Sequence, residues 1–165
     1  MIEIIKPVGE VIKRLEEVIS LNKSRKPTKT LTLDEFLKRP LPHMDIPKSS
    51  CGVNFEKDEE KISGLLKECA EILEYDHVTN CTRMEANTQL PWHTNSDNEG
   101  YRIYYIKGKG VFKYLDENGN QQLSYDDPND WTCRKFKVVK EKPFWHSAYA
   151  EETRFAFGFG RSLWR

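Results

Sequence analysis

A short polar stretch, LPWHTNSD over residues 90–97, places a histidine among groups that can bind a metal. His93 follows Trp92, with Asn95 two positions later and Asp97 four positions later. An imidazole beside oxygen donors suits a divalent first-row metal. The alternative is a hydrogen-bonded turn in which His93 has no chemical role. The other motifs of the chain bear on the choice between a metal ligand and a turn residue.

Two later segments, FWHSAYA over residues 144–150 and TRFAFGFG over residues 153–160, read as strands. Because side chains alternate between the faces of a strand, one face of each carries a single reactive group, His146 or Arg154, among alanines and glycines. If these faces point inward, they leave a cavity lined by both residues, since a structural core would be filled with larger apolar side chains. The alternative is that they pack closely against a neighbouring layer.

These residues occur in the order that a site for a divalent first-row metal would need. Two histidines and a carboxylate leave coordination positions open for a bidentate cosubstrate and oxygen. His93 and His146 supply the imidazoles, and Arg154, eight residues after His146, could pair bidentately with a carboxylate of the cosubstrate.

The first part of the chain is predicted to be helical. Apolar residues recur at helical spacing over residues 7–20 and 58–75, and a capping box from Thr32 to Glu35 predicts a short helix over residues 33–39.

After residue 75 the apolar pattern changes to short β-branched and aromatic segments, with a hairpin turn at Asn118–Gly119. Helices followed by strands predict an α+β fold, a jelly roll whose N-terminal helices pack on one outer sheet face. We expect one domain over residues 1–165, with a mainly helical support region over residues 1–75 and a β core over residues 76–161.

The composition excludes several classes of function. The 165 residues carry 26 basic and 26 acidic side chains, which gives no electrostatic argument for a nucleic-acid partner or an anionic membrane. No apolar run reaches membrane-spanning length, and the N-terminus lacks signal-peptide order. Four cysteines without a C-x-x-C pair predict structural thiols in a reducing, cytoplasmic setting; they are Cys51, Cys69, Cys81 and Cys133.

The two polar motifs together resemble the Fe(II)- and 2-oxoglutarate-dependent dioxygenases of the double-stranded β-helix (cupin-like) fold, of the kind found in marine viruses and bacteria. The resemblance covers about residues 77–161. MEANTQLPWHTNSD is similar to the segment leading into the first metal histidine. KPFWHSAYAEETRFAFGFG is similar to the segment that holds the distal histidine and the cosubstrate arginine.

This resemblance implies that His93 and His146 bind Fe(II), that Arg154 binds 2-oxoglutarate, and that these three residues form the catalytic set. The enzyme would hydroxylate a small-molecule or peptidyl substrate that the sequence does not name. Loops over residues 94–100 and 126–132 would border the substrate.

One position departs from the family pattern, in which the first motif is His-x-Asp or His-x-Glu. Here Asn95 occupies the third position, and an amide is a weaker iron ligand than a carboxylate. Asn95 could ligate weakly or hold a water, Asp97 could reach the metal, or the site could keep two histidines alone. The last arrangement occurs in the aspartyl/asparaginyl β-hydroxylases, to which the chain has a weaker likeness.

That weaker likeness adds two candidates for binding the cosubstrate. Arg102 in GYRIYYI is a second candidate for the carboxylate, and Tyr104, which stands where that family has a histidine, could donate a hydrogen bond. Two non-dioxygenase alternatives remain. One is a non-catalytic cupin-like module that binds a small molecule or a protein and has a decayed metal site; the other is a metal-dependent cupin without 2-oxoglutarate.

Overall fold

The computed structural model describes residues 2–22, 29–40, 53–54, 59–94 and 99–163. The helices are α1 (Gly9–Leu21), α2 (Leu33–Lys38) and α3 (Glu60–Leu73). The strands are β1 (Glu3–Ile5), β2 (Val53–Asn54), β3 (His77–Met84), β4 (Thr88–His93), β5 (Gly100–Lys107), β6 (Gly110–Leu115), β7 (Gln121–Tyr125), β8 (Thr132–Val138), β9 (His146–Ala150) and β10 (Arg154–Arg161).

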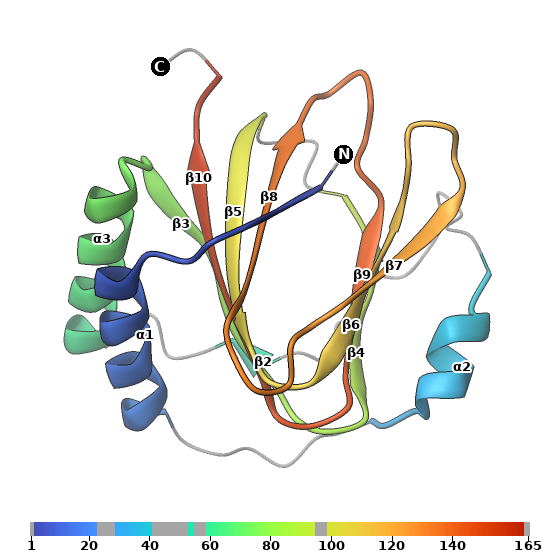
Figure 1. The fold of residues 1–165 in the computed structure, drawn as a ribbon, viewed down its shortest axis with the longest axis horizontal. Helices are drawn as coiled ribbons and strands as arrows, with labels where there is room; N and C mark the ends of the chain where they lie inside the picture. The colour runs from blue at the N-terminus through green and yellow to red at the C-terminus, as the bar shows by residue number, and fades with distance from the viewer. Residues whose placement is uncertain (1, 23–28, 41–52, 55–58, 95–98, 164–165) are drawn as a thin grey trace.

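The strands form two antiparallel sheets that face each other, with the helices on their outer sides (Figure 1). The larger sheet has the order β1-β8-β5-β10-β3-β2, and the smaller has the order β4-β9-β6-β7. Strands that are distant in the sequence are therefore neighbours in space, as in a jelly roll. The predicted jelly-roll-like α+β class is confirmed. Two short strands that the sequence did not predict, β1 and β2, add segments of the first 75 residues to the larger sheet.

Helices α1 and α3 cover the outer face of the six-stranded sheet, because each has one apolar stripe. Val11, Leu15 and Val18 of α1 are fully buried in one cluster with residues of α3 and the sheet. On β10, Phe157 and Phe159 point into this cluster, as the alternation in TRFAFGFG predicted. Burial of these apolar side chains holds the helices to the sheet.

Helix α2 lies on the other sheet, so the prediction that the helices share one sheet face is wrong for this element (Figure 1). The predicted capping box is present: the Thr32 hydroxyl accepts from the Glu35 backbone N–H at 3.1 Å. Phe36 stacks on Tyr149 of β9 with ring centroids 5.3 Å apart. The small sheet also has an outer face with apolar side chains, and helix α2 buries part of it.

Three of the four cysteines lie in the core and none of these three forms a disulfide; they are Cys69, Cys81 and Cys133. Burial raises the pKa of the Cys69 and Cys133 thiols to about 12, as expected for structural thiols. Cys51 lies outside the described residues. Within the described ranges, no helix has the length and apolar character needed to cross a membrane.

The contact between α2 and the small sheet includes a buried lysine. Lys113 of β6 is fully buried, and its Nζ donates to the Phe36 carbonyl of α2 at 2.6 Å. The same ammonium lies 4.2 Å from the Phe36 ring centroid and 4.9 Å from that of Trp92. Burial, with a smaller effect of the nearby Arg39 charge, lowers the pKa of Lys113 to about 8.

This lowered pKa predicts a pH dependence of stability. In the unfolded chain the pKa of Lys113 is near its ordinary value of 10.5, so between about pH 8 and 10.5 the unfolded chain binds more protons than the folded one. The free energy of unfolding of the wild type should therefore rise, relative to Lys113→Met, by up to about 1.4 kcal/mol per pH unit in this window. Urea unfolding of both proteins at several pH values measures it. A difference that stays constant across the window would contradict the prediction.

Candidate functional site

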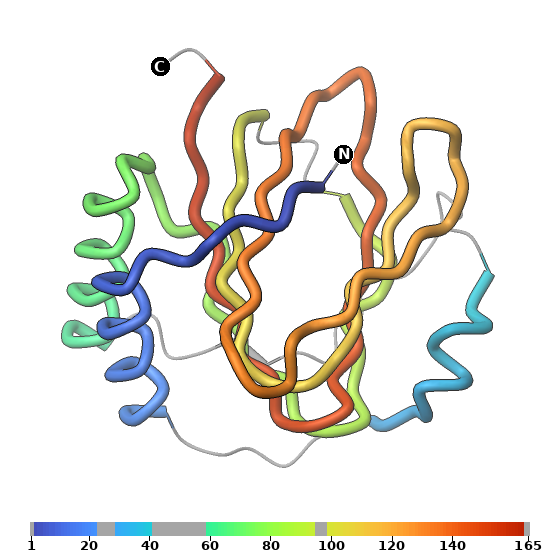
Figure 2. The backbone as a smooth tube through the Cα atoms, viewed as in Figure 1, coloured from blue at the N-terminus to red at the C-terminus, as the bar shows by residue number. Residues whose placement is uncertain are grey.

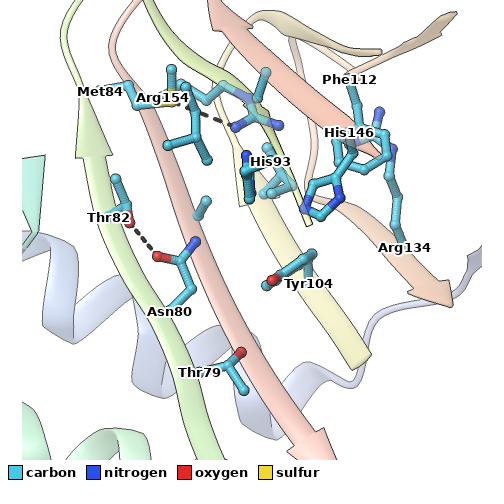
Figure 3. Close-up of a pocket in the computed structure, with 14 residues that line it drawn as sticks. Thr79, Asn80, Thr82, Met84, His93, Tyr104, Phe112, Arg134, His146 and Arg154 are labelled. Carbon is cyan, nitrogen blue, oxygen red and sulfur yellow. Dashed lines mark hydrogen bonds between the residues drawn. The ribbon is translucent and has the colours of Figure 1, made fainter. Parts of the chain in front are cut away.

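A cavity of about 210 Å³ lies between the two sheets, and residues from seven strands line it. His146 of β9 and Arg154 of β10 face this cavity (Figure 3). Ala148 of β9 and Ala156 of β10 line it too. His93, at the end of β4, lines it as well. The two strand faces therefore do point inward, and the structure brings His93, His146 and Arg154 into one cavity.

The small residues of β10 have two different effects. Ala156 lines the cavity, but the space above Gly158 and Gly160 is filled by side chains from neighbouring strands. A Cβ at Gly158 would lie 2.0 Å from Cε1 of Tyr104, and one at Gly160 would lie 2.7 Å from Nε2 of His77. The expectation that the whole inner face of β10 borders empty space is therefore wrong for these two glycines.

The two histidines are adjacent, and the ring of each is held by a hydrogen bond between Nδ1 and a backbone carbonyl. Their ring centroids are 4.1 Å apart, and His93 pairs with His146 across β4 and β9. Nδ1 of His93 is 2.7 Å from the Pro91 carbonyl, and Nδ1 of His146 is 2.8 Å from the Phe144 carbonyl. A carbonyl can only accept, so each Nδ1 carries the proton and each Nε2 carries the lone pair. Metal-binding histidines are commonly held by this bond to a backbone carbonyl.

Burial keeps both imidazoles neutral. It lowers the pKa of His93, against a smaller opposite effect of the bond to Pro91. Burial also lowers the pKa of His146 well below its ordinary value, and the neighbouring His93 adds to this effect. Neutral imidazole is the form that binds metals. The pair is thus in the protonation state that a metal site requires.

The third ligand of the predicted metal site cannot be placed in the same way. Asn95 and Asp97 both lie outside the described residues. Within the ranges that the structure describes, no group of three His, Cys, Asp or Glu side chains could hold a metal ion. The described part of the site is therefore a two-histidine arrangement.

Arg154 lies in the same cavity with unused hydrogen-bonding capacity. Only 2% of the residue is exposed, and its Nε donates to Oδ2 of Asp126 at 2.7 Å. Its Nη1 contacts the Met84 sulfur at 3.9 Å, and its Nη2 is buried with no hydrogen-bond partner among the described residues. A buried guanidinium with an unsatisfied N–H group is suited to an anionic ligand, above all a carboxylate.

Asp126 connects Arg154 to a second buried arginine. Its Oδ1 accepts from Nη1 of Arg134 at 2.6 Å, and its carboxylate is fully buried. The other guanidinium donors of Arg134 bond Ser124 at 3.1 and 2.9 Å, so Arg134 is satisfied by the protein. Two guanidiniums share one carboxylate, which leaves an excess of one positive charge beside the cavity. Burial raises the pKa of Asp126, but the charges of Arg154 and Arg134 outweigh this effect and hold the pKa below its usual value.

The two further cosubstrate candidates differ in position. Tyr104 lines the cavity from β5. Arg102, two residues earlier on the same strand, is 2% exposed and donates to the Tyr101 carbonyl at 3.2 Å, but it is not among the residues that line the cavity. Arg154 is thus better placed than Arg102 to meet a ligand in the cavity.

The two loops expected to border the substrate are described to different extents. Residues 126–132 are described, whereas residues 95–98 lie outside the described residues, so the expectation for the loop over 94–100 stays a prediction. The register of β5 with β8 pairs Gly100 with Val138 and Ile106 with Thr132, so Gly100 and Thr132 lie at opposite ends of these strands (Figure 2). Asp126, which the sequence presented as part of an acidic loop, is instead a buried partner of Arg154.

Sequence reasoning missed five polar residues of the site. Asp126 and Arg134 form the ion pairs just described. The other three line the cavity from β3; they are Thr79, Asn80 and Thr82. The alternation along β8 places Arg134 on the same face as Phe136 and Val138, and that apolar face was the available signal for a buried arginine. No pattern in the loop distinguishes Asp126 from its acidic neighbours.

Comparison with solved structures supports the fold. A prolyl hydroxylase from Trichoplax adhaerens, solved in complex with a hypoxia inducible factor oxygen degradation domain peptide fragment, matches with a TM-score of 0.55 and 15% sequence identity. The match covers 96% of this chain and 82% of that chain. At this identity the likeness shows a shared fold and no more.

A second structure, the capsular polysaccharide assembling protein CapF from Staphylococcus aureus, has a TM-score of 0.22 and 11% identity over 99% of this chain and 52% of that chain, which is too low to support an argument. No protein-family profile and no curated protein sequence matches the chain.

The buried ion pairs predict a large effect of removing the Asp126 charge. Asp126→Asn should lower the free energy of unfolding by roughly 3–5 kcal/mol, because it leaves two guanidiniums buried without a counter-charge. Urea unfolding measures the change. Asp127→Asn is the matched control in the same loop, since Asp127 is exposed and its Oδ1 only accepts from the Asn129 backbone N–H, as an amide oxygen also can. Equal losses in the two variants would contradict a special role for Asp126.

Proposed function

We propose that the chain is an Fe(II)- and 2-oxoglutarate-dependent oxygenase that hydroxylates a C–H bond of its substrate. The observation that carries this proposal is the joint placement of two groups in one cavity. Two neutral imidazoles present Nε2 lone pairs beside a buried arginine whose Nη2 has no partner among the described residues. The first group suits a divalent metal, and the second suits a carboxylate. The fold shared with a prolyl hydroxylase is compatible with this chemistry.

Each residue then has one role. His93 and His146 bind the metal through Nε2, while the carbonyls of Pro91 and Phe144 fix the orientation of the rings. Arg154 holds the distal carboxylate of 2-oxoglutarate, and Asp126 fixes the guanidinium through its Nε. When bound, iron and 2-oxoglutarate would activate O₂, which is the oxidant for the hydroxylation. The apolar wall that includes Leu90, Ile106 and Phe112 excludes water from the reacting groups.

We propose that the third protein ligand, if the site has one, is Asp97 or Asn95. A carboxylate binds iron more strongly than an amide, so Asp97→Ala would weaken metal binding if Asp97 is the ligand, and Asn95→Ala would do so if Asn95 is. If neither variant changes the metal affinity, the site uses the two histidines alone.

We propose that the substrate is peptidyl, and a free small molecule is the second candidate. The solved prolyl hydroxylase holds a peptide fragment, and a shared fold gives both proteins a barrel with an interior site. No nucleic-acid partner is proposed, because the 26 basic and 26 acidic residues balance.

One observation favours a second candidate function. The guanidinium of Arg154 has a buried Nη2 without a partner among the described residues, and this group can bind an anion with no metal present. The second candidate is therefore a non-catalytic barrel that binds an anionic small molecule through Arg154. Binding measurements separate the two functions, because only the oxygenase requires metal and 2-oxoglutarate together.

The first test of the proposal is an anaerobic titration of the full chain with Fe(II) and 2-oxoglutarate, monitored by visible absorption. We expect a charge-transfer band that needs both additions and is absent in His146→Ala, because that variant loses an iron ligand. Thermal unfolding with each ligand gives an independent measure, since a ligand that binds the folded state raises the Tm. If no band forms and neither ligand raises the Tm, the oxygenase proposal fails. If only 2-oxoglutarate raises the Tm, the second function holds.

A second test identifies the arginine that holds the carboxylate. Arg154→Met should weaken 2-oxoglutarate binding by about 100-fold, because a bidentate charged contact of this kind contributes about 1.5–3 kcal/mol and the variant also leaves Asp126 with one partner fewer. Calorimetric titration measures the affinity. Arg102→Met is the matched control, since Arg102 is equally buried but does not line the cavity. Loss of binding in Arg102→Met with retention in Arg154→Met would reverse the assignment.

A further inference from the structure

An irregularity in β3 turns two consecutive side chains into the cavity. The pairing of β10 with β3 shifts between Gly158 and Phe159, which pair with Asn80 and Val78, so Thr79 is an extra residue on β3. In a regular strand, Thr79 and Asn80 would point to opposite faces. Here both line the cavity. Bulges are found next to functional sites because they redirect side chains in this way.

The adjoining strand accommodates this bulge at a glycine. A Cβ at Gly158 would lie 2.6 Å from Oγ1 of Thr79, in addition to its clash with Tyr104. Any larger residue at this position would therefore displace the Thr79 hydroxyl. Gly158 and the bulge are two separate features of the fold, and both are needed to hold the hydroxyl where it lies.

The two polar groups have hydrogen-bonding capacity that the protein does not use. The Thr79 hydroxyl oxygen is buried and has no hydrogen-bond partner among the described residues. The Asn80 side-chain oxygen accepts from the Thr82 hydroxyl, so the amide nitrogen points the other way, toward the middle of the cavity (Figure 3). An unsatisfied buried hydroxyl destabilises the folded protein. Its retention beside a donor in a cavity is explained if both groups bind a ligand.

These groups lie at the opposite end of the cavity from Arg154. In Figure 3, Arg154 lies near Met84 at one end of the cavity, Thr79 lies at the other, and the two histidines lie between them. The register agrees, since Arg154 pairs with Met84, five residues along β3 from Thr79. A cosubstrate that extends from the histidines to Arg154 leaves the Thr79 end for the substrate.

The chemistry of this wall indicates what it recognises. Asn80 offers an N–H donor, and Thr79 offers a hydroxyl that both donates and accepts. The charged side chains among the described lining residues are Arg134 and Arg154, and both already bond Asp126. The guanidinium with an unpartnered nitrogen, Arg154, lies at the opposite end of the cavity from Thr79 (Figure 3), so a carboxylate or an ammonium at Thr79 and Asn80 would be buried away from a group that can pair with it. A neutral amide, which carries one acceptor and one donor, matches both groups.

We infer that Thr79 and Asn80 determine substrate specificity, and that they select a substrate with a neutral amide group, a side-chain carboxamide or a peptide amide, next to the C–H bond that is oxidised. This inference rests on the proposed function. The Asn80 amide nitrogen donates to the carbonyl of the substrate amide, and the Thr79 hydroxyl accepts from its N–H. The two bonds hold the neighbouring carbon beside the histidine pair.

The test uses three probes of the same shape, propanamide, propanoate and butanone. Binding to the full chain is followed by the methyl resonances of Met84 and Ala148, which line the cavity, first without additions and then with Zn(II) and 2-oxoglutarate. We expect propanamide to bind about tenfold more tightly than either of the other probes, since each of these lacks one of the two hydrogen bonds. Thr79→Val and Asn80→Asp, which keep the side-chain shapes, should each remove this preference.

Ser147→Ala is the matched control, because Ser147 also has a buried hydroxyl without a partner among the described residues but lies on the opposite face of β9 from His146. It should leave the preference unchanged. Thr79→Val should also raise the Tm, because it removes an unsatisfied hydroxyl. If Thr79 had only a structural role, Thr79→Val would instead lower the Tm and leave the preference for propanamide unchanged.

Several results would overturn the inference: equal affinities for the three probes, a preference for propanoate, no binding of any probe up to its solubility limit, or an unchanged preference in both β3 variants. The outcome is separable from that of the proposed function. If the protein prefers propanamide but forms no complex with Fe(II) and 2-oxoglutarate, the proposed oxygenase function fails and amide recognition by Thr79 and Asn80 stands. If the complex forms but propanamide is not preferred, the oxygenase function stands and amide recognition fails.

Discussion

The buried carboxylate of Asp126 joins the two sheets of the barrel at one end. Asp126 directly follows β7 of the small sheet, and its two oxygens bond Arg134 of β8 and Arg154 of β10, which belong to the large sheet. The Asp126 backbone N–H also donates to the Gly110 carbonyl, at a position where a Cβ would lie 3.0 Å from the carboxylate. The cavity lies beside this junction, so the positions of its lining residues depend on it.

The same interaction sets the electrostatics of the interior. Three buried charges are costly to desolvate, and one carboxylate cannot neutralise two guanidiniums. Arg134 satisfies its remaining donors with Ser124, whereas Arg154 keeps an Nη2 without a partner among the described residues. Both arginines line the cavity, but of the two it is Arg154 that keeps a nitrogen able to bind an anion. An anionic ligand at Arg154 would complete a charge arrangement that the protein leaves incomplete, while the imidazoles remain neutral because they are buried.

Much of the site could be predicted from local patterns, and the failures have physical causes. The alternation in TRFAFGFG placed Arg154 inward correctly, because strand geometry determines which side chains share a face. The same alternation did not show that Tyr104 fills the space above Gly158, since cross-strand neighbours depend on the register. Helix α2 was expected beside the other helices, but an apolar stripe does not specify which of two sheets it covers.

The sequence by itself determined the class of elements, the order of the polar motifs and the candidate residues His93, His146 and Arg154, because propensity, alternation and spacing are local properties. Only the tertiary structure decided that the two imidazoles lie 4.1 Å apart, that Asp126 is a buried partner of Arg154, and that the β3 bulge turns Thr79 and Asn80 into one cavity. These features depend on which distant strands pair and in what register, and that is settled by burial and packing of the whole chain.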